Sequence, residues 1–447
     1  MMHDSIAAPM PIWRRLQDLL ARRPFLRNVA IMLGGSAGGQ AISIVLSPLL
    51  TRLYSPQQFG ILSIYSAILA IIVVTASLRY ELALPLAKSD EDAFNLMAVG
   101  VSALLITTLM MVGASILFPE EWLEDLWPQP LNSEHVAPYR GLLVLGFFCL
   151  GGYYVALYFA TRAEAFGAIA RTRLAQGIVG PLTQIALAFL GGGAPALLVG
   201  SIIGQSAGTF GLFHAVLARR GELWAALSWR RMGEMARRFI RFPLVAGPAA
   251  LLDALGGNHL LYLLVSLDFT AKIAGFLFLA ERILSRPLSI IGTSILQVFV
   301  GEAGRNVSQD PAKLRRRFYQ VVGRQALLAA LWIAAVNAGA VLLFAKIFGA
   351  EWGEAVPYLQ AMSPAFLALA VVLPVFHTLQ ILEKQVIAAA WQASRLALSI
   401  GAFVILSRSG APPVWVVAGY GAAQAFSCAL LLALMAWQVG KLQEIEP

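Results

Sequence analysis

Long apolar runs separated by short polar segments dominate the chain. A helix needs about 20 apolar residues to cross a bilayer. Twelve runs of this kind lie near residues 28–50, 59–79, 94–118, 139–160, 174–191, 196–217, 243–265, 273–299, 321–345, 358–382, 386–406 and 414–437. The runs are unbroken and rich in Leu, Ala and Ile, whereas membrane-spanning strands would alternate over about ten residues. The pattern therefore predicts an all-α integral membrane protein with 12 transmembrane helices.

The amino-acid composition is typical of a membrane protein and argues against a soluble enzyme. Of 447 residues, 59% are hydrophobic and 13% are charged, and the mean hydropathy is +0.73. Soluble chains carry roughly 45–50% apolar and about 25% charged residues. The two cysteines, Cys149 and Cys428, lie in apolar runs and are expected to be free thiols, so no metal site is predicted. The first run is too long for a secretory signal and is expected to be retained.

The basic residues predict the orientation of the chain in the membrane. With the N-terminus inside, 25 of the 33 Lys and Arg residues fall in inner segments and five in outer segments. Because cytoplasmic segments carry the excess of Lys and Arg, both termini are predicted to be cytoplasmic. This distribution accounts for the net charge of +9 without a nucleic-acid partner.

The longest polar interruption divides the chain into two halves of six spans each. Five segments are predicted: an amphipathic N-terminal segment (1–27), a six-helix lobe (28–217), a basic interfacial linker (218–242), a second six-helix lobe (243–438) and a cytoplasmic tail (439–447). Trp and Arg alternate at helical spacing in the linker, which is typical of a helix that contacts anionic lipids of the inner leaflet. A parallel repeat is expected, because each half enters the membrane in the same orientation. Similar turns, residues 55–60 and 269–275, open the second and the eighth span.

Ionisable residues at membrane depth are the candidate functional groups, because each costs about 2.5–3.5 kcal/mol in lipid and usually faces a wet or protein-lined interior. The candidates for binding an anionic cargo are Arg282, Arg286, Arg395, Arg79 and Arg52, and the candidates for coupling or charge balance are Asp253, Glu281 and Glu81.

Arg282 and Arg286 are the strongest pair, because they are four residues apart and about 6 Å apart on one helix face. This spacing suits two neighbouring phosphates, which guanidinium groups bind in a bidentate manner. Pro287 follows and is expected to kink the helix at a cavity wall.

Each of these residues also has a purely structural interpretation. The acids could neutralise nearby arginines, and Arg52, Arg79 and Glu81 could be interfacial anchors. Two histidines and an aromatic cluster remain open in the same way, as helix-packing residues or as a relay and a sugar-stacking surface; they are His259, His377, Tyr153, Tyr154, Tyr158 and Phe159.

Five segments, taken in their order along the chain, resemble those of polysaccharide exporters and lipid-linked oligosaccharide flippases. They are residues 51–60, 78–87, 241–243, 280–287 and 348–355. The chain is therefore similar to members of the multidrug/oligosaccharidyl-lipid/polysaccharide exporter (MOP) superfamily from about residue 27 to 437. The resemblance implies two six-helix lobes around a central cavity that opens alternately to each side of the bacterial cytoplasmic membrane. It also implies an undecaprenyl-diphosphate-linked oligosaccharide as cargo, for O-antigen, capsule or exopolysaccharide assembly, with polymerase and chain-length proteins as possible partners.

Two other functions remain as alternatives. A cation-coupled multidrug exporter of the same superfamily is expected to have an acidic cavity, whereas arginines outnumber acids here. A polysaccharide polymerase or ligase would need an extended outer domain, and the longest outer loop, residues 119–138, has about twenty residues. A transporter that is not an enzyme is therefore predicted. No cofactor is expected, since no phosphate-binding loop ends in Gly-Lys-Ser/Thr, and coupling to protons or sodium stays open.

Overall fold

The computed structural model describes residues 24–117, 137–217, 222–255 and 259–441. All regular elements in these ranges are helical. The predicted N-terminal amphipathic segment falls almost entirely outside the described residues, as do most of the outer loop 119–138 and most of the C-terminal tail.

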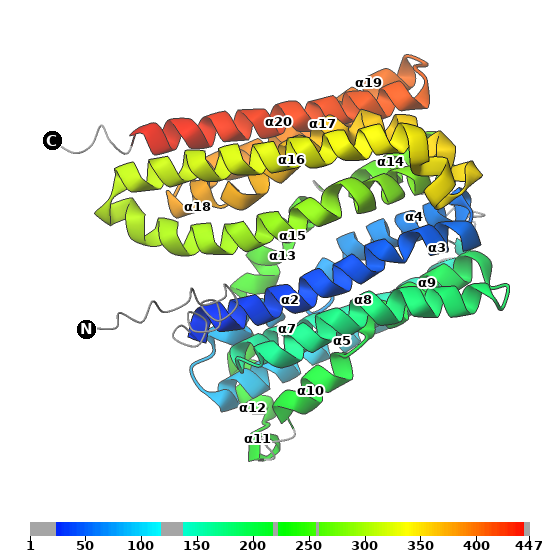
Figure 1. Cartoon of the computed structure of the whole chain (residues 1–447). Coiled ribbons are helices and arrows are strands. Elements are labelled where there is room, and N and C mark those ends of the chain that lie inside the picture. Colours follow the sequence, from blue (N-terminus) through cyan, green and yellow to red (C-terminus); the bar gives the residue numbers. More distant parts are fainter. Residues whose placement is uncertain (1–23, 118–136, 218–221, 256–258, 442–447) are drawn as a thin grey trace, which may run out of the picture.

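Two lobes of helices lie side by side, as Figure 1 shows. The first lobe contains α2 (Pro24–Val45), α3 (Ser47–Leu53), α4 (Pro56–Ile72), η1 (Val73–Thr75), η2 (Tyr80–Leu86), α5 (Asp90–Leu117), η5 (Ala137–Tyr139), α7 (Arg140–Arg162), α8 (Phe166–Ala188), α9 (Gly193–Ser206) and α10 (Thr209–Leu217). The second contains η6 (Phe242–Ala246), α13 (Gly247–Leu255), α14 (His259–Asp268), α15 (Ala271–Gln309), α16 (Pro311–Phe348), η7 (Ala350–Ala355), α17 (Val356–Val372), η8 (Leu373–Val375), α18 (Thr378–Ile381), α19 (Gln385–Arg408) and α20 (Pro413–Lys441).

Each of the twelve predicted runs corresponds to one helix or to consecutive helices of this fold, so the predicted all-α, two-lobe transmembrane architecture is confirmed. Within the described residues, eight helices are long and apolar enough to span a bilayer on their own. The helices outside that set include α2, α8 and α15. Gly, Ser, Gln or charged residues lower the apolar content of these three helices. Their polar positions are explained by the cavity described below.

The eighth run forms one helix, α15, which continues through Pro287 as the length of the run predicts. The kink expected at Pro287 stays a prediction. Two details of the helices differ from the sequence pattern. The seventh run is not one straight helix, because α13 and α14 meet at an angle of 55°. The inner loop expected between the eighth and ninth runs is helical, since α15 extends to Gln309 and α16 begins at Pro311.

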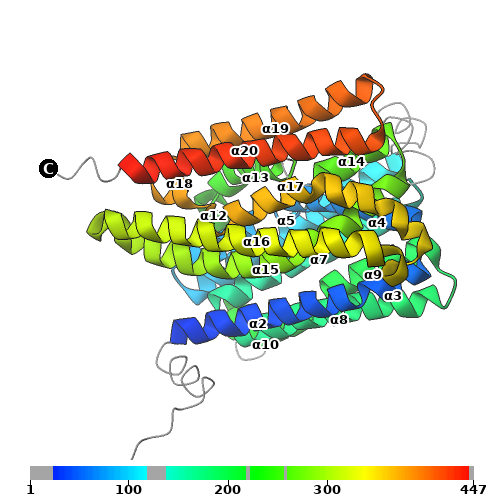
Figure 2. The same cartoon turned by 45° about the horizontal axis from the view of Figure 1, so that its top comes forward.

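The α15–α16 hairpin reaches past the neighbouring helices at the end of the bundle where α2 begins and α20 ends, as Figure 2 shows. Its two helices have 39 and 38 residues. At 1.5 Å per residue each is about 58 Å long, which exceeds the roughly 30 Å hydrocarbon core of a bilayer. The side chain of Asp310 caps α16 by accepting a hydrogen bond from the backbone N–H of Lys313 at 2.9 Å. This cap and Pro311 fix the turn between the two helices.

Small residues let helices of the first lobe approach closely. A Cβ atom on Gly39 of α2 would lie 2.5 Å from the carbonyl oxygen of Arg173, and one on Gly177 of α8 would lie 2.2 Å from the carbonyl oxygen of Gly39. Glycines at helix crossings are typical of membrane proteins, where packing rather than the hydrophobic effect drives helix association.

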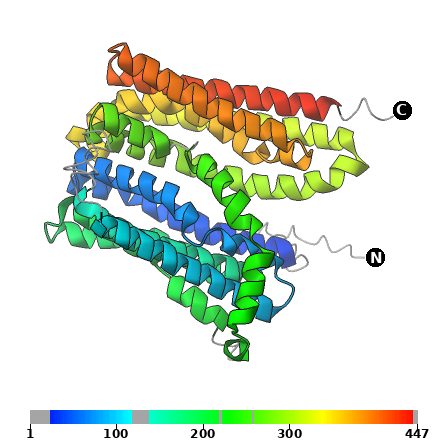
Figure 3. The same cartoon turned by 180° about the vertical axis from the view of Figure 1, so that it is seen from behind.

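The linker between the lobes contains two short helices, α11 (Glu222–Ala225) and α12 (Trp229–Arg238), and Figure 3 shows it along one edge of the molecule. Arg231 forms an ion pair with Glu91 of α5. This hydrogen bond and the negative charge of Glu91 raise the pKa of Arg231. Trp229 remains 85% exposed. Contact of this helix with anionic lipid stays a prediction.

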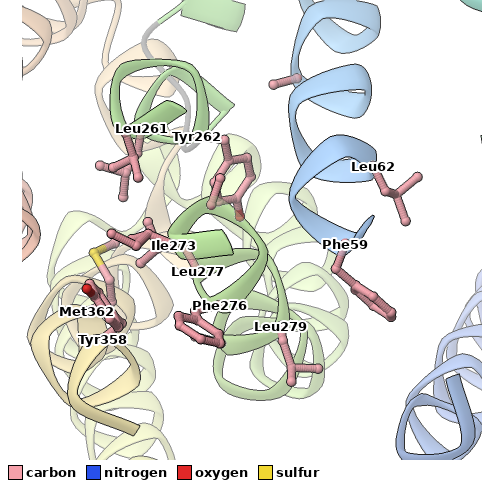
Figure 4. Close-up of a cluster of buried hydrophobic side chains, with 14 of the residues drawn as sticks. Phe59, Leu62, Leu261, Tyr262, Ile273, Phe276, Leu277, Leu279, Tyr358 and Met362 are labelled. Atoms are coloured by element: carbon pink, nitrogen blue, oxygen red, sulfur yellow. The ribbon is translucent and has the colours of Figure 1, made fainter. Parts of the chain in front are cut away.

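The lobes pack together most closely where α4 crosses α15. A Cβ atom on Gly60 would lie 1.8 Å from the carbonyl oxygen of Ala271, and one on Gly275 would lie 2.0 Å from the carbonyl oxygen of Pro56. The two turns that are similar in sequence therefore meet each other. A buried apolar cluster continues from this crossing, and Figure 4 shows α4, α15 and α17 side chains in it.

Candidate functional site

A cavity of about 860 Å³ lies between the two lobes. Its lining comes from α2, α4, α7, α8 and α9 of the first lobe and from α13, α14 and α15 of the second. The lining starts beyond the α4–α15 glycine crossing and includes Arg79, Tyr158 and Arg286. The lobes are thus in contact at one end of the molecule and separated by the cavity toward the other.

The wall from the second lobe carries the predicted arginine pair, Arg282 and Arg286. Nη2 of Arg282 donates hydrogen bonds to the carbonyl oxygen of Ser43 at 2.7 Å and to its Oγ at 2.5 Å. Ser43 lies on α2, so this contact joins the two lobes across the cavity. Within the described residues neither arginine forms an ion pair with a carboxylate. Both charges are therefore available to an anionic ligand, Arg286 directly and Arg282 by exchanging Ser43.

The acids of the same wall engage neutral partners. Glu281 accepts a hydrogen bond from the hydroxyl of Tyr262, and Asp253 accepts one from Nε2 of Gln392 at 2.5 Å. His259 also lines the cavity, and its Nδ1 is buried without a hydrogen-bond partner among the described residues. In the described residues, neither acid forms an ion pair with Arg282 or Arg286.

The wall from the first lobe is rich in phenol and amide groups. Tyr153, Tyr154 and Tyr158 of α7 contribute the rings, and the guanidinium of Arg173 lies 5.6 Å from the centre of the Tyr153 ring. The amides come from Gln40, Gln176, Gln184 and Gln205. Among the described residues, Oε1 of Gln40 and the hydroxyl of Tyr153 are buried without a partner. Buried polar groups usually find a partner in protein or water, so these two atoms indicate a hydrated or ligand-binding surface.

Arg79 and Glu81 lie next to this wall in an unusual backbone conformation. Arg79 lines the cavity, and its Nη1 is 3.6 Å from Oε1 of Glu81. Glu81 is buried and also accepts a hydrogen bond from Ser77. Leu78 and Arg79 have φ values of 51° and 64°, a left-handed conformation that costs about 1–3 kcal/mol in a non-glycine residue and is concentrated at functional sites. Arg79 and Glu81 therefore form an ion pair beside the cavity, and their roles as cargo-binding residue and charge-balancing acid stay predictions.

Four of the sequence-predicted candidates lie away from the cavity. Arg52 donates from Nη2 to the carbonyl oxygen of Lys346 at 2.9 Å, at the closed end. Arg395 is buried inside the second lobe. Phe159 is buried between helices of the first lobe, and His377 contacts Gln380. The prediction that every deep arginine faces the central cavity is therefore too broad for Arg52 and Arg395.

Arg173 and the polar face of α8 were not predicted from the sequence as parts of the site. Residues 173, 177, 180 and 184 are spaced by three or four, residue 176 adjoins them, and all five line the cavity. This spacing places them on one helix face, so helical periodicity could have identified the wall.

The closed end of the interface is built around Trp352 of η7, which is 1% exposed. Its Nε1 donates to the carbonyl oxygen of Thr51 at 2.9 Å. Its ring meets those of Phe59 and Phe276 edge to face, with centroids 5.0 and 6.0 Å away. The sequence segments 51–60, 269–275 and 348–355 therefore converge to close this end.

The cavity is a cationic, water-accessible site. Its charged lining consists of four arginines, Arg79, Arg173, Arg282 and Arg286, and two acids, Asp253 and Glu281. The described residues contain no group of three or more His, Cys, Asp or Glu side chains that could bind a metal ion. The arrangement can hold a large anionic, hydroxyl-rich ligand.

A family model described as polysaccharide biosynthesis protein matches residues 49–357. No curated protein matches the sequence. Among solved structures, an inward-facing multidrug resistance MATE family transporter of the MOP superfamily is similar, with a TM-score of 0.64 and 13% identity, over 92% of this chain and 96% of that chain.

An outward-facing conformation of a MATE transporter is similar with a TM-score of 0.57 and 13% identity, over 94% of this chain and 96% of that chain. A MOP superfamily transporter from Pyrococcus furiosus, described as having a binding pocket of reverse polarity, is similar with a TM-score of 0.54 and 14% identity, over 94% and 96%. At these identities the similarity establishes the fold.

Proposed function

The chain is a member of the polysaccharide biosynthesis protein family, and we propose that it moves an undecaprenyl-diphosphate-linked oligosaccharide across the bacterial cytoplasmic membrane. The cargo enters from the cytoplasmic leaflet and leaves in the outer leaflet, where it serves O-antigen, capsule or exopolysaccharide assembly. The observation that carries this proposal is a cavity between two lobes whose arginines outnumber its acids. Two of these arginines, Arg282 and Arg286, have no carboxylate partner in the described residues.

The cavity lowers the main free-energy barrier to such a transfer, which is the loss of hydrogen bonds by the sugar headgroup in the bilayer. Each unpaired hydroxyl costs roughly 4–8 kcal/mol in an alkane-like medium, so a sugar headgroup cannot cross the bilayer unaided. The amide and phenol groups of the first-lobe wall are suited to sugar hydroxyls, and Arg282 and Arg286 to the diphosphate. The polyprenyl chain stays in the lipid while the headgroup occupies the cavity.

The closed and open ends of the interface support alternating access. With both termini in the cytoplasm, the cavity opens inward and the contacts of Trp352 close the outer end. Phosphate binding at Arg282 competes with Ser43 for the guanidinium, which weakens the contact between lobes at mid-depth. Separation of α4 from α15 then opens the outer end.

The driving force follows from the charge of the cargo. An anion that leaves a negative cytoplasm gains about 2.3 kcal/mol per charge per 100 mV. Protons or sodium ions could reset the empty carrier through Asp253 or Glu281, the two acids of the cavity. This part of the proposal concerns coupling and needs no catalytic residue.

A multidrug exporter of the same superfamily fits the cavity less well. Organic cations would be attracted by unpaired carboxylates, whereas both cavity acids accept hydrogen bonds from neutral groups. A polymerase or ligase would require a reacting constellation of side chains, and the cavity instead presents hydrogen-bond donors and rings. Transport of an anionic glycolipid is therefore the function that we propose.

The proposal is tested with purified protein in sealed liposomes that contain undecaprenyl-diphosphate-linked sugar in one leaflet. We expect the protein to expose the sugar to an impermeant glycosidase on the opposite side. The double variant Arg282→Gln, Arg286→Gln should slow this transfer at least tenfold, and Arg408→Gln, an exposed arginine outside the cavity lining, should not. Equal transfer by empty and protein-containing liposomes would overturn the proposal.

A further inference from the structure

Arg395 of α19 lies in the interior of the second lobe with an uncompensated charge. It is 8% exposed, and its guanidinium lies 5.1 Å from the centre of the Trp391 ring. Within the described residues it forms neither a hydrogen bond nor an ion pair, and its Nε is completely buried. A cation–π contact contributes about 0.5–2 kcal/mol, which does not replace the hydration that a buried guanidinium loses.

Several polar side chains around Arg395 also lack partners. Ser399 lies one helical turn further along α19, on the same face, and is 1% exposed. Ser427 of α20 is fully buried, and its backbone carbonyl accepts a hydrogen bond from Nε1 of Trp391 at 2.7 Å. The hydroxyls of both serines have no partner among the described residues. Two adjacent helices therefore bring unpaired O–H groups to the surroundings of one unpaired cation.

One further group extends this cluster. Tyr420 is close enough to Arg395 to interact with it electrostatically, and its hydroxyl oxygen accepts a hydrogen bond from Nε2 of Gln424 at 3.2 Å, which leaves the phenolic hydrogen free to donate. Each unpaired buried polar group costs about 1–3 kcal/mol, so a missing partner is the simplest explanation.

No carboxylate of the described residues supplies that partner. The nearest candidate along the polar face of α19 is Asp253 of the cavity wall, whose carboxylate binds Gln392, three residues before Arg395. Asp253 and Arg395 do not form an ion pair. The contact between Asp253 and Gln392 nevertheless connects the cavity wall to the polar face that carries Arg395 and Ser399.

We propose that the second lobe contains a binding site for a small inorganic anion of the chloride class, held by Arg395 with the hydroxyls of Ser399 and Ser427. All three groups are hydrogen-bond donors, as an anion requires, and the guanidinium supplies the charge. A metal cation is disfavoured by the same guanidinium and by the absence of a carboxylate from the cluster. A water molecule could pair the hydroxyls but would leave the arginine charge uncompensated.

Anion binding to the folded protein alone would raise its stability by mass action. The test is thermal unfolding of the full-length protein in detergent, with sodium chloride replaced stepwise by sodium gluconate at constant sodium concentration. We expect the unfolding temperature to rise with the logarithm of the chloride concentration above its Kd, by about 3 °C at a hundredfold excess of chloride over the Kd. Bromide should act like chloride.

Variants locate the effect. Arg395→Gln should abolish the chloride dependence, Ser399→Ala should weaken it severalfold, and Arg408→Gln on the same helix should leave it unchanged. Identical chloride and gluconate curves for the unmodified protein would overturn the proposal, as would an unaltered chloride dependence in Arg395→Gln. If Arg395→Gln does not fold, the Ser399→Ala titration and anomalous scattering from bromide in crystals decide: a bromide peak beside Arg395 supports the site, and its absence at saturating bromide refutes it. The outcome is independent of glycolipid transport.

Discussion

At its two ends, the interface between the lobes is built from different chemistry. One end is dry and closely packed. Gly60 and Gly275 allow backbone contact there, and the aromatic rings of Phe59, Phe276 and Trp352 fill the remaining space. The other end is a cavity whose lining is cationic and hydroxyl-rich. Close packing tolerates almost no displacement, whereas a hydrated surface adapts to ligands of varied shape. In the proposed transport cycle, the closed end is therefore the gate and the cavity is the binding surface.

The first span connects these two regions. Four side-chain hydrogen bonds cross between the lobes in the described residues, one from Trp352 to Thr51, one from Arg52 to Lys346 and two from Arg282 to Ser43. All four involve α2 or α3. Ser43 and Thr51 are eight residues apart, about 12 Å along a helix. A ligand that displaces Ser43 from Arg282 therefore acts on the same span that holds the closed end.

The largest effect is expected from adding a methyl group at the gate. In Gly60→Ala, the new Cβ would lie 1.8 Å from a backbone oxygen of Ala271, which cannot move away as a side chain could. We expect loss of the closed state and of transport. Spin labels at the exposed positions Gln57 and Glu351, in a protein with Cys149 and Cys428 replaced, should report longer distances. Gly113→Ala, where the added Cβ meets open space, is the control, and equal distances in both variants would contradict the gate.

Removal of the gate indole should have the next largest effect. Burial of a large aromatic side chain contributes about 3–5 kcal/mol relative to Ala, and Trp352 also donates a hydrogen bond across the lobes. Trp352→Ala should lower the unfolding temperature and increase the population with a separated outer end. Trp415→Ala, at a residue that is 67% exposed, should do neither. A closed distance distribution in Trp352→Ala would show that the glycine crossing alone closes the gate.

Smaller effects are expected on the binding surface. A hydrogen bond to a charged group is worth about 1.5–3 kcal/mol, or roughly a 10- to 150-fold change in affinity. Arg286→Gln should weaken binding of a short-chain prenyl diphosphate by this factor, measured by calorimetry in detergent. Unchanged affinity would remove Arg286 from the binding site.

The smallest expected effect tests the contact between the two regions. Ser43→Ala removes one of the two acceptors of Arg282 and keeps the carbonyl. The freed guanidinium should bind the same diphosphate about threefold to tenfold more tightly. Weaker binding would indicate that Ser43 supports the ligand instead of competing with it. Ser409→Ala, at an exposed serine outside the cavity lining, is the control.

The sequence predicted well which residues lie at membrane depth, and poorly which part of the protein their side chains face. Apolar length identified all twelve spans, because a bilayer imposes the same requirement on each. The free-energy cost of a charged side chain in lipid identified Arg282, Arg286 and Arg395 as facing away from the lipid. This cost is avoided equally whether the helix face borders the cavity or the interior of one lobe. Arg395 therefore lies inside the second lobe, and only tertiary packing distinguishes it from Arg282.

Other features depended on contacts between distant segments. The convergence of Thr51, Phe59, Phe276 and Trp352 joins three elements that are far apart in the chain, and no local pattern specifies it. Arg173 is near a helix end, where basic residues are ordinary. Its role in the cavity became visible through its alignment with Gln176 and Gln184 on one face of α8.

The accessibility of cysteines introduced on α4 tests most directly whether the interface between the lobes is open at one end and sealed at the other. Ser66 lines the cavity, and Ser63, three residues earlier, is fully buried in the closed end. In a protein with Cys149 and Cys428 replaced, a hydrophilic impermeant thiol reagent added on the side of the termini should modify Ser66→Cys and spare Ser63→Cys. Equal protection of both positions, or modification of both, would contradict a cavity that opens at one end and is sealed at the other.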